Sequence, residues 1–398
     1  MLRRTSIVFI ALIVLIVGIS VSFGAYTLLS LPSSPTPSPS PSSTPQASPS
    51  PSASPTATPS SSPTPAATPT PSSTPTPTAT PTPSPTSVVV DDATGAQVNV
   101  SLPVNRIVCL TSAETVHALG AGNKIVGIAG MLTTDVKAIL PSSILNLPVV
   151  GDTDTAPNME LIIELQPDLV LASQRLIDGN RKTLEDAGIA VLEDSQTGSR
   201  RNQYMTNLGL ILNAEQRVNE LLDYEEHYWN LVQERVANLS RSEKPLVYFE
   251  WYKAWFSTGP GGSYTRLIEA AGGINVGENA TVSSPQLTSE FVLEQNPDII
   301  IRMLDYTSGE DLAAFQNLRS SILSRPGVSE LKATINGRVY VVKSTLLVER
   351  DVVGLLYFAK WFHPDLFADI DPADVHAEMI QKYFGATVQG VYTLCMKK

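Results

Sequence analysis

Two stretches of this chain repeat one pattern: residues 158–171, NMELIIELQPDLVL, and residues 288–301, TSEFVLEQNPDIII. They align without a gap. Asn158 and Thr288 are natural helix N-caps, each Pro-Asp pair is typical of the turn after a helix, and each following apolar triplet is typical of a buried strand. A helix, turn and strand repeated in this way predict two homologous lobes.

The segments around the repeat alternate between strand and helix patterns. A hairpin is expected at 88–100, strands at 106–110, 125–128, 168–172 and 190–192, and helices at 159–165 and 180–187. Residues 214–239 contain neither Pro nor Gly and carry an apolar stripe, so they predict one long helix. The alternation then restarts at 246–250. The sequence thus predicts an α/β fold with two Rossmann-like lobes (88–213 and 241–398), mainly parallel sheets and one linking helix (214–240).

The sequence that precedes the two predicted lobes has a different composition. Arg3 and Arg4 stand before an uncharged run long enough to cross a bilayer, so residues 1–31 are expected to be a transmembrane anchor, or else a signal peptide cleaved before Ala25. Residues 32–87 are rich in Ser-Pro and Thr-Pro steps and predict a disordered linker. The expected location is therefore the external face of a membrane, or the medium if the segment is cleaved. No cysteine is available here for a lipid anchor.

Charge and residue counts exclude several classes of protein. The chain of 398 residues carries a formal net charge of −11, and no charged residue occurs between Thr5 and Val90. An acidic folded part argues against a nucleic-acid binder, which needs clustered Lys and Arg. Two cysteines, Cys109 and Cys395, exclude a disulfide-rich scaffold. The four histidines show no metal-ligand spacing, so no metal site and no cofactor are expected.

Motifs in both halves resemble one known family. With the repeat itself, they match the metal-chelate group of substrate-binding proteins of ABC transporters, which captures ferric siderophores, haem or cobalamin. The further matching segments are 92–95 with 106–108, 117–127, 149–151, 269–275 and 336–340. The resemblance covers residues 88–384, and the tail 385–398 has no recognised counterpart. It implies a ligand held between the lobes, and it implies no catalysis.

The resemblance also implies partners. Proteins of this group dock on an ABC permease, which works with an ATPase, through one surface carboxylate on each lobe. Those positions fall on Glu160 and Glu290 of the repeat. An acidic residue in the first turn of a helix also interacts favourably with the helix dipole, and this is the structural alternative to docking.

The ligand site is expected beyond the carboxyl ends of the parallel strands. This places it at residues 111–114, 173–175, 250–255 and 302–305. Aromatic side chains there would suit a wide, flat chelate, and arginines would suit its anionic groups. The candidate ligand-binding residues are Trp251, Tyr252, Trp255, Arg175, Arg302 and Arg350.

Three other functions stay open at this point. A molybdate or tungstate oxyanion is favoured if the loop Gly259–Ser263 and arginines form a small anion cage. A surface enzyme on the same scaffold is a second alternative, although no nucleophile, metal or nucleotide motif is present. A surface sensor or adhesion module is the third.

Overall fold

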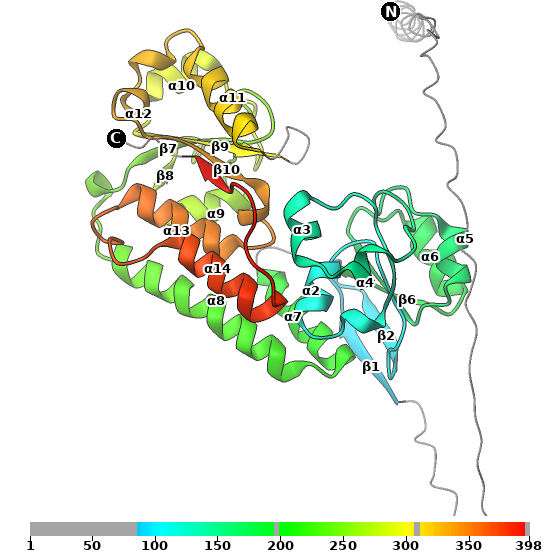
Figure 1. The fold of residues 1–398 in the computed structure, drawn as a ribbon. Helices are drawn as coiled ribbons and strands as arrows, with labels where there is room; N and C mark the ends of the chain where they lie inside the picture. Colours follow the sequence, from blue (N-terminus) through cyan, green and yellow to red (C-terminus); the bar gives the residue numbers. More distant parts are fainter. Residues whose placement is uncertain (1–85, 195–198, 306–310, 395–398) are drawn as a thin grey trace, which may run out of the picture. The chain divides into compact units, whose positions relative to one another are not determined.

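The structure, a computed structural model, describes residues 86–194, 199–305 and 311–394 (Figure 1). The expected anchor or signal peptide at 1–31 and nearly all of the expected linker lie outside these residues. The first described element is a hairpin of β1 (Thr86–Asp91) and β2 (Gln97–Leu102), so strand structure begins two residues before the expected lobe boundary. In the described ranges, no helix is both long and apolar enough to cross a membrane.

The N-terminal lobe, residues 86–213, is built on a four-stranded sheet. All its strands are parallel, in the order β4-β3-β5-β6. The first four residues of β5 are fully buried, as expected for a parallel strand covered on both faces. The strands are β3 (Ile107–Cys109), β4 (Ile125–Ile128), β5 (Leu169–Ser173) and β6 (Ala190–Asp194).

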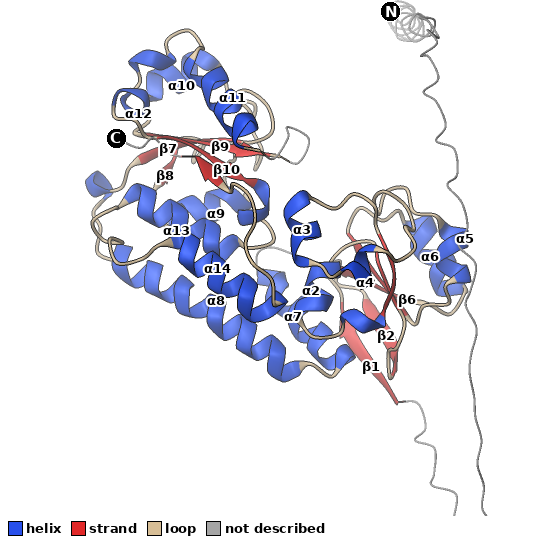
Figure 2. Ribbon diagram, in the orientation of Figure 1, coloured by secondary structure: helices blue, strands red, loops and turns tan. Residues whose placement is uncertain are grey.

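Helices cover both faces of this sheet (Figure 2). Val108 and Val170 pack with Ile162 of α5 and Leu184 of α6 on one face. The opposite face packs on α2 and α7. The helices of the lobe are α2 (Ala113–Ala118), η1 (Gly122–Lys124), α3 (Thr134–Ile139), α4 (Ser142–Leu145), α5 (Met159–Glu164), α6 (Asp178–Asp186) and α7 (Ser199–Leu212).

The expected long helix is present as α8 (Glu215–Val236), 22 residues long. Residues 237 and 238 form a turn instead of continuing it. Val218, Leu221 and Val232 are buried from one stripe of α8. They join a hydrophobic cluster that also contains side chains of α7 and of α13 in the C-terminal lobe, so α8 packs on both lobes.

The C-terminal lobe, residues 241–394, has a five-stranded sheet in the order β11-β10-β9-β7-β8. Its strands are parallel except β11, which is antiparallel to β10. Strand β11 comes from the tail 385–398, in which no counterpart to the family motifs was recognised. The strands are β7 (Leu246–Glu250), β8 (Ile274–Asn275), β9 (Ile299–Leu304), β10 (Val339–Lys343) and β11 (Thr393–Leu394).

In Figure 1, α9, α13 and α14 lie on the side of this sheet that faces α8, and α10, α11 and α12 lie on the other. The hydrophobic clusters agree, since Val292 of α10 and Ile322 of α11 pack apart from Leu267 of α9 and Leu355 of α13. The helices are η2 (Arg241–Glu243), α9 (Ser263–Ala270), α10 (Ser289–Gln295), α11 (Leu312–Leu323), η3 (Val328–Glu330), α12 (Lys332–Ile335), η4 (Ser344–Leu346), α13 (Asp351–Phe362) and α14 (Pro372–Phe384).

The structure confirms the duplication at the level of hydrogen bonds. Asn158 accepts from the Leu161 amide at 3.1 Å, and Thr288 accepts from the Phe291 amide at 3.2 Å, so both act as N-caps. Gln166 and Asn296, which are equivalent, both adopt positive φ where the chain leaves the helix. The Asp168 carboxylate accepts from the Arg106 amide beside β3, and the Asp298 carboxylate accepts from the Leu246 amide of β7, each at 2.9 Å. Both Pro-Asp turns therefore tie their strand to the neighbouring one.

Candidate functional site

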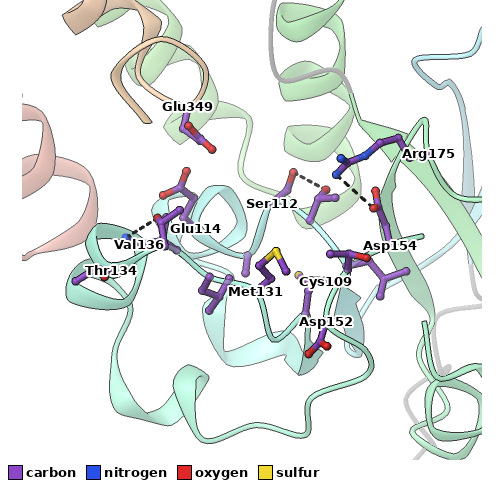
Figure 3. A pocket seen from close by; sticks show the side chains of 17 residues that line it. Cys109, Ser112, Glu114, Met131, Thr134, Val136, Asp152, Asp154, Arg175 and Glu349 are labelled. Carbon is purple, nitrogen blue, oxygen red and sulfur yellow. Dashed lines mark hydrogen bonds and ion pairs between the residues drawn. The ribbon is translucent and has the colours of Figure 1, made fainter. Parts of the chain in front are cut away.

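A pocket of about 530 Å³ opens at the carboxyl edge of the N-terminal sheet. We call it the N-lobe pocket (Figure 3). It lies where the strand-end argument placed the ligand, since residues 111–114 and Arg175 line it. The other described lining residues are Cys109, Leu110, Ala129, Met131, Leu132, Thr133, Thr134, Val136, Asp152, Thr153, Asp154 and Glu349.

Short polar contacts fix the floor of this pocket. Ser112 caps α2 with a left-handed backbone (φ 60°), and its hydroxyl donates to the Asp194 carboxylate at 2.7 Å. The Thr111 hydroxyl donates to the same oxygen. On the other side, the Ser173 hydroxyl donates to Asp154, whose side chain is 1% exposed. The loops after β3 and β5 are thus held by carboxylates at the sheet edge.

A second pocket of about 340 Å³, the C-lobe pocket, lies where the chain passes from β7 to α9. A Cβ atom at Gly259 would collide with the Val282 carbonyl oxygen, so only glycine permits the close approach of these two loops. Gly262 is the N-cap residue of α9. The lining residues are Trp251, Ser257, Thr258, Gly261, Gly262, Ser263, Tyr264, Ser283, Ser284, Leu347 and Val348.

One short segment reaches both pockets. After β10 the chain turns through η4, and then Leu347 and Val348 line the C-lobe pocket while Glu349 lines the N-lobe pocket. Figure 3 shows the side chain of Glu349 close to that of Glu114, although the two come from different segments of the chain. Burial and the charge of Glu114 raise the pKa of Glu349 to about 8. Burial also raises the pKa of Glu114, although Arg350 counteracts it.

The next residue, Arg350, crosses between the lobes. Its guanidinium lies 3.1 Å from Glu114 and 3.2 Å from Asp135, and Lys343 lies 3.0 Å from Asp135. Burial alone would raise the pKa of Asp135, but Lys343 and Arg350 hold it at about 2. We call these four side chains the interlobe ion cluster.

Two other arginines surround Glu250, at the end of β7. Glu250 is fully buried and accepts two hydrogen bonds from Arg325, at 2.6 and 2.9 Å. Arg302 lies 3.2 Å from the same carboxylate and donates to the Tyr252 carbonyl oxygen at 2.9 Å. These contacts hold the segment that follows β7 against the end of β9.

The candidate ligand residues fall into two groups. Trp251 lines the C-lobe pocket, Tyr252 is 47% exposed, and Arg175 is exposed in the N-lobe pocket, 3.4 Å from Asp154. In contrast, Arg302 and Arg350 are buried and already face carboxylates of the protein.

Trp255 lies in the second group. Its ring stacks on Tyr248 with centroids 6.0 Å apart, and Arg325 lies 4.9 Å from its centroid. It packs against the hydrophobic cluster that contains Val292 of α10, whereas Trp251 packs against the cluster on the opposite face of the sheet. In a continuing strand, residues four apart would share a face. The chain instead turns after β7, and Trp255 itself has a positive φ of 60°, so the turn places the two tryptophans on opposite faces of the sheet.

Glu160 and Glu290 are both exposed, in the first turns of α5 and α10. Hydrogen bonds at its own helix terminus lower the pKa of Glu290. The structure thus presents one equivalent surface carboxylate on each lobe.

Sequence reasoning did not single out Glu349, Asp154 or Met131 as lining residues. Glu349 reaches the N-lobe pocket from a segment more than 230 residues away from Glu114, and no sequence pattern marks that approach. Asp154 lies in a loop without a predicted element, and only its proximity in space to Ser173 makes it part of the strand edge. Within residues 86–194, 199–305 and 311–394, no group of three His, Cys, Asp or Glu side chains is placed to hold a metal ion.

The family model described as "Periplasmic binding protein" matches residues 107–346, which include strands β3 to β10 and most of the residues that line the two pockets. The chain belongs to the periplasmic binding protein family. This finding confirms the resemblance to substrate-binding proteins that the sequence motifs indicated. In this periplasmic binding protein, the two pockets occupy equivalent edges of the two sheets.

Individual relatives carry different names. An uncharacterized ABC transporter substrate-binding lipoprotein of Bacillus subtilis, YvrC, is 28% identical over 71% of this chain and 87% of its own length. A cobalamin-binding protein of Halobacterium salinarum is 27% identical over 54% of this chain and 58% of its own length. The molybdate-binding protein MolA of Haemophilus influenzae is 22% identical over 74% of this chain and 90% of its own length.

Solved structures agree on the fold. The TroA-like periplasmic binding protein FepB of Veillonella parvula superposes with a TM-score of 0.67 at 25% identity, over 78% of this chain and all of that one. The molybdate-bound MolA of Haemophilus influenzae reaches a TM-score of 0.64 at 19% identity, over 76% of this chain and 99% of its own. The two-lobed α/β fold with mainly parallel sheets is therefore shared.

Proposed function

We propose that this protein is the external substrate-binding component of an ABC importer, and that it captures an iron chelate or a corrinoid between its lobes and delivers it to a permease with its own ATPase. The observation that carries the proposal is the segment after β10, which contributes to a pocket at the sheet edge of each lobe. A ligand seated there would contact both lobes at once. The similarity to cobalamin-binding proteins supports a corrinoid.

Trp251, Tyr252 and Arg175 are the residues that we propose contact the ligand. Exposed or pocket-lining aromatic side chains supply large contact areas to a flat chelate. Arg302, Arg350 and Trp255, which are engaged within the protein, would hold the walls of the site. No catalytic step belongs to this function.

Native mass spectrometry of the full-length protein offered ferric siderophores, haem, cobalamin and molybdate tests the proposal. We expect one chelate or corrinoid to be retained with one-to-one stoichiometry. Tyr252→Ala and Arg175→Ala should each weaken its binding about fivefold or more. Phe291→Ala, which truncates a partly exposed aromatic residue on α10, is the matched control and should bind normally. Retention of no compound from the panel contradicts the proposal.

One observation favours a second candidate, a molybdate-type oxyanion. The C-lobe pocket combines the N-terminus of α9 with several hydroxyl groups, and a molybdate-binding relative shares the fold. However, no lysine or arginine is among the described residues that line this pocket. The anion cage of loop and arginines that this candidate needs is therefore not formed by the described lining residues.

For delivery, we propose that Glu160 and Glu290 dock on the permease. We also propose that residues 1–31 keep the protein at the external face of a membrane and that residues 32–87 act as its tether. The relative YvrC is named a lipoprotein, whereas the proposed anchor of this chain contains no cysteine.

A further inference from the structure

Carboxylates outnumber cations among the charged side chains that line the N-lobe pocket. Glu114, Asp152, Asp154 and Glu349 line it, and Arg175 is the one described lining residue with a cationic side chain. These five side chains come from four separate segments of the chain, which the fold brings around one cavity (Figure 3). The pocket therefore has an acidic wall even when Glu349 holds a proton.

The cations near the two pockets are engaged elsewhere. Arg350 and Lys343 face Asp135, and both side chains are nearly inaccessible to water. Arg302 and Arg325 face the buried Glu250. The C-lobe pocket offers hydroxyl, aromatic and aliphatic side chains among its described lining residues. An anionic ligand would thus meet carboxylates on one lobe and find few positive charges on the other.

Two carboxylate oxygens at the N-lobe pocket lack hydrogen-bond donors. Asp154 is 1% exposed, and its Oδ1 atom accepts no hydrogen bond within the described chain, with the Arg175 guanidinium 3.4 Å away. The Oε2 atom of Glu349 is buried and also accepts none. A buried acceptor without a donor destabilises a protein, so a ligand that brings a donor to Asp154 Oδ1 gains affinity.

We propose that the N-lobe pocket binds the part of the ligand that carries hydrogen-bond donors or positive charge, such as carboxamide or ammonium groups, and that the protein selects neutral or cationic chelates over anionic ones. This inference rests on the proposed function, because it assumes that the ligand lies between the lobes. It narrows the class of ligand to amide-bearing corrinoids and uncharged or cationic ferric chelates. Carboxylates around the site repel an anion before contact as well as within it.

Matched pairs of probes test the selectivity by isothermal titration calorimetry on the full-length protein. The first pair is cyanocobalamin and its derivative with three side-chain amides hydrolysed to carboxylates. The second is a neutral ferric trihydroxamate and a trianionic ferric tris-catecholate. If either compound of a pair binds, we expect the uncharged compound to bind at least about tenfold more tightly than the anionic one. Tighter binding of the anionic member overturns the inference.

A double variant tests whether the carboxylates of the N-lobe pocket cause the selectivity. Asp152→Asn with Glu349→Gln removes two carboxylates from the pocket and should strengthen binding of the anionic probe about fivefold or more. Glu234→Gln with Glu330→Gln removes two carboxylates at exposed positions outside both pockets, which is at least as large a change of net charge. This control should leave the ratio within a pair unchanged. An equal effect of the two double variants overturns the inference, since long-range net charge would then explain the selectivity.

A measurement without any ligand separates this inference from the proposed function. Met131 lines the pocket and is 55% exposed, so its labelled methyl group reports the local concentration of soluble nitroxide probes. A cationic nitroxide should relax this methyl signal about three times as strongly as an anionic one, and the pocket double variant should reduce that ratio. A stronger effect of the anionic nitroxide overturns the inference. Cationic enrichment without retention of any chelate would contradict the proposed function alone.

Discussion

Arg350 of the C-terminal lobe donates to the carboxylate of Asp135 in the N-terminal lobe at 3.2 Å, and the two side chains are 2% and 1% exposed. Glu114 and Lys343 complete the interlobe ion cluster around them. A buried ion pair is costly to break, because each charge left alone has lost its water without keeping its partner. The cluster therefore couples the position of the lobes to the stability of the fold.

Replacing Arg350 should destabilise the protein strongly. Arg350→Met keeps most of the side-chain volume but leaves Asp135 and Glu114 without their guanidinium, and we expect a loss of about 3–5 kcal/mol in the free energy of unfolding. Urea denaturation measures it. Arg241→Met removes a surface ion pair between Glu278 and the Arg241 side chain, which is 72% exposed. This variant should lose at most about 1 kcal/mol in the free energy of unfolding. Similar costs for the two variants would contradict the assigned role of Arg350.

The ion cluster should also make stability depend on acid pH. The pKa of Asp135 is held at about 2 in the folded protein, against 3.8 for the free side chain. Its contribution is therefore present above pH 3.8 and is lost as the pH falls toward 2. Between pH 5 and 2, the wild type should lose about 2 kcal/mol more than Asp135→Asn. Parallel stability curves for the two proteins would refute this.

Glu349 should act in the opposite direction. Its pKa is raised to about 8 in the folded protein, so folding favours the protonated form, and stability declines as the pH rises from 4.5 to 8. Glu349→Gln cannot ionise and should avoid this loss. Relative to wild type, the variant should gain at least about 1 kcal/mol between pH 4.5 and 8.5, measured by denaturation at each pH. A constant difference across this range would show that Glu349 ionises freely.

The repeated N-caps should contribute equally. Asn158→Ala and Thr288→Ala each remove a side-chain acceptor for a helix amide, and each should cost about 1 kcal/mol in the free energy of unfolding. Ser329→Ala, at an exposed position, should change stability by less than about 0.5 kcal/mol. No cost at either cap would mean that water replaces the side chain there.

The proposed docking carboxylates give a prediction for transport. The double variant Glu160→Ala with Glu290→Ala should keep its ligand affinity and lose uptake in cells that contain the permease. Glu164→Ala with Glu294→Ala removes the other duplicated pair of exposed carboxylates, at the opposite ends of the same helices, and should keep uptake. Unchanged uptake in the first variant would exclude docking through these residues.

Local sequence signals predicted most of the architecture. The repeat at 158–171 and 288–301 has helix caps, Pro-Asp turns and apolar strands within fourteen residues, and each of these features acts over neighbouring positions. The boundaries of β4 and β7 coincide with the predicted ones for the same reason. Strand β11 was not predicted, because two residues carry no strand pattern of their own and pair only where β10 offers a free edge.

The sequence by itself determined two α/β lobes, the long helix α8, the family and the edges of the sheets at which pockets form, because these follow from periodicity and local capping. The tertiary structure decided which polar residues face a pocket. In the sequence, Arg350 and Arg302 were equally good candidates to bind an anionic ligand. In the fold, they form ion pairs with Asp135 and Glu250 instead. Asp135 lies 215 residues from Arg350 in the sequence. A buried arginine needs a carboxylate beside it, and only the packed chain shows which carboxylate that is.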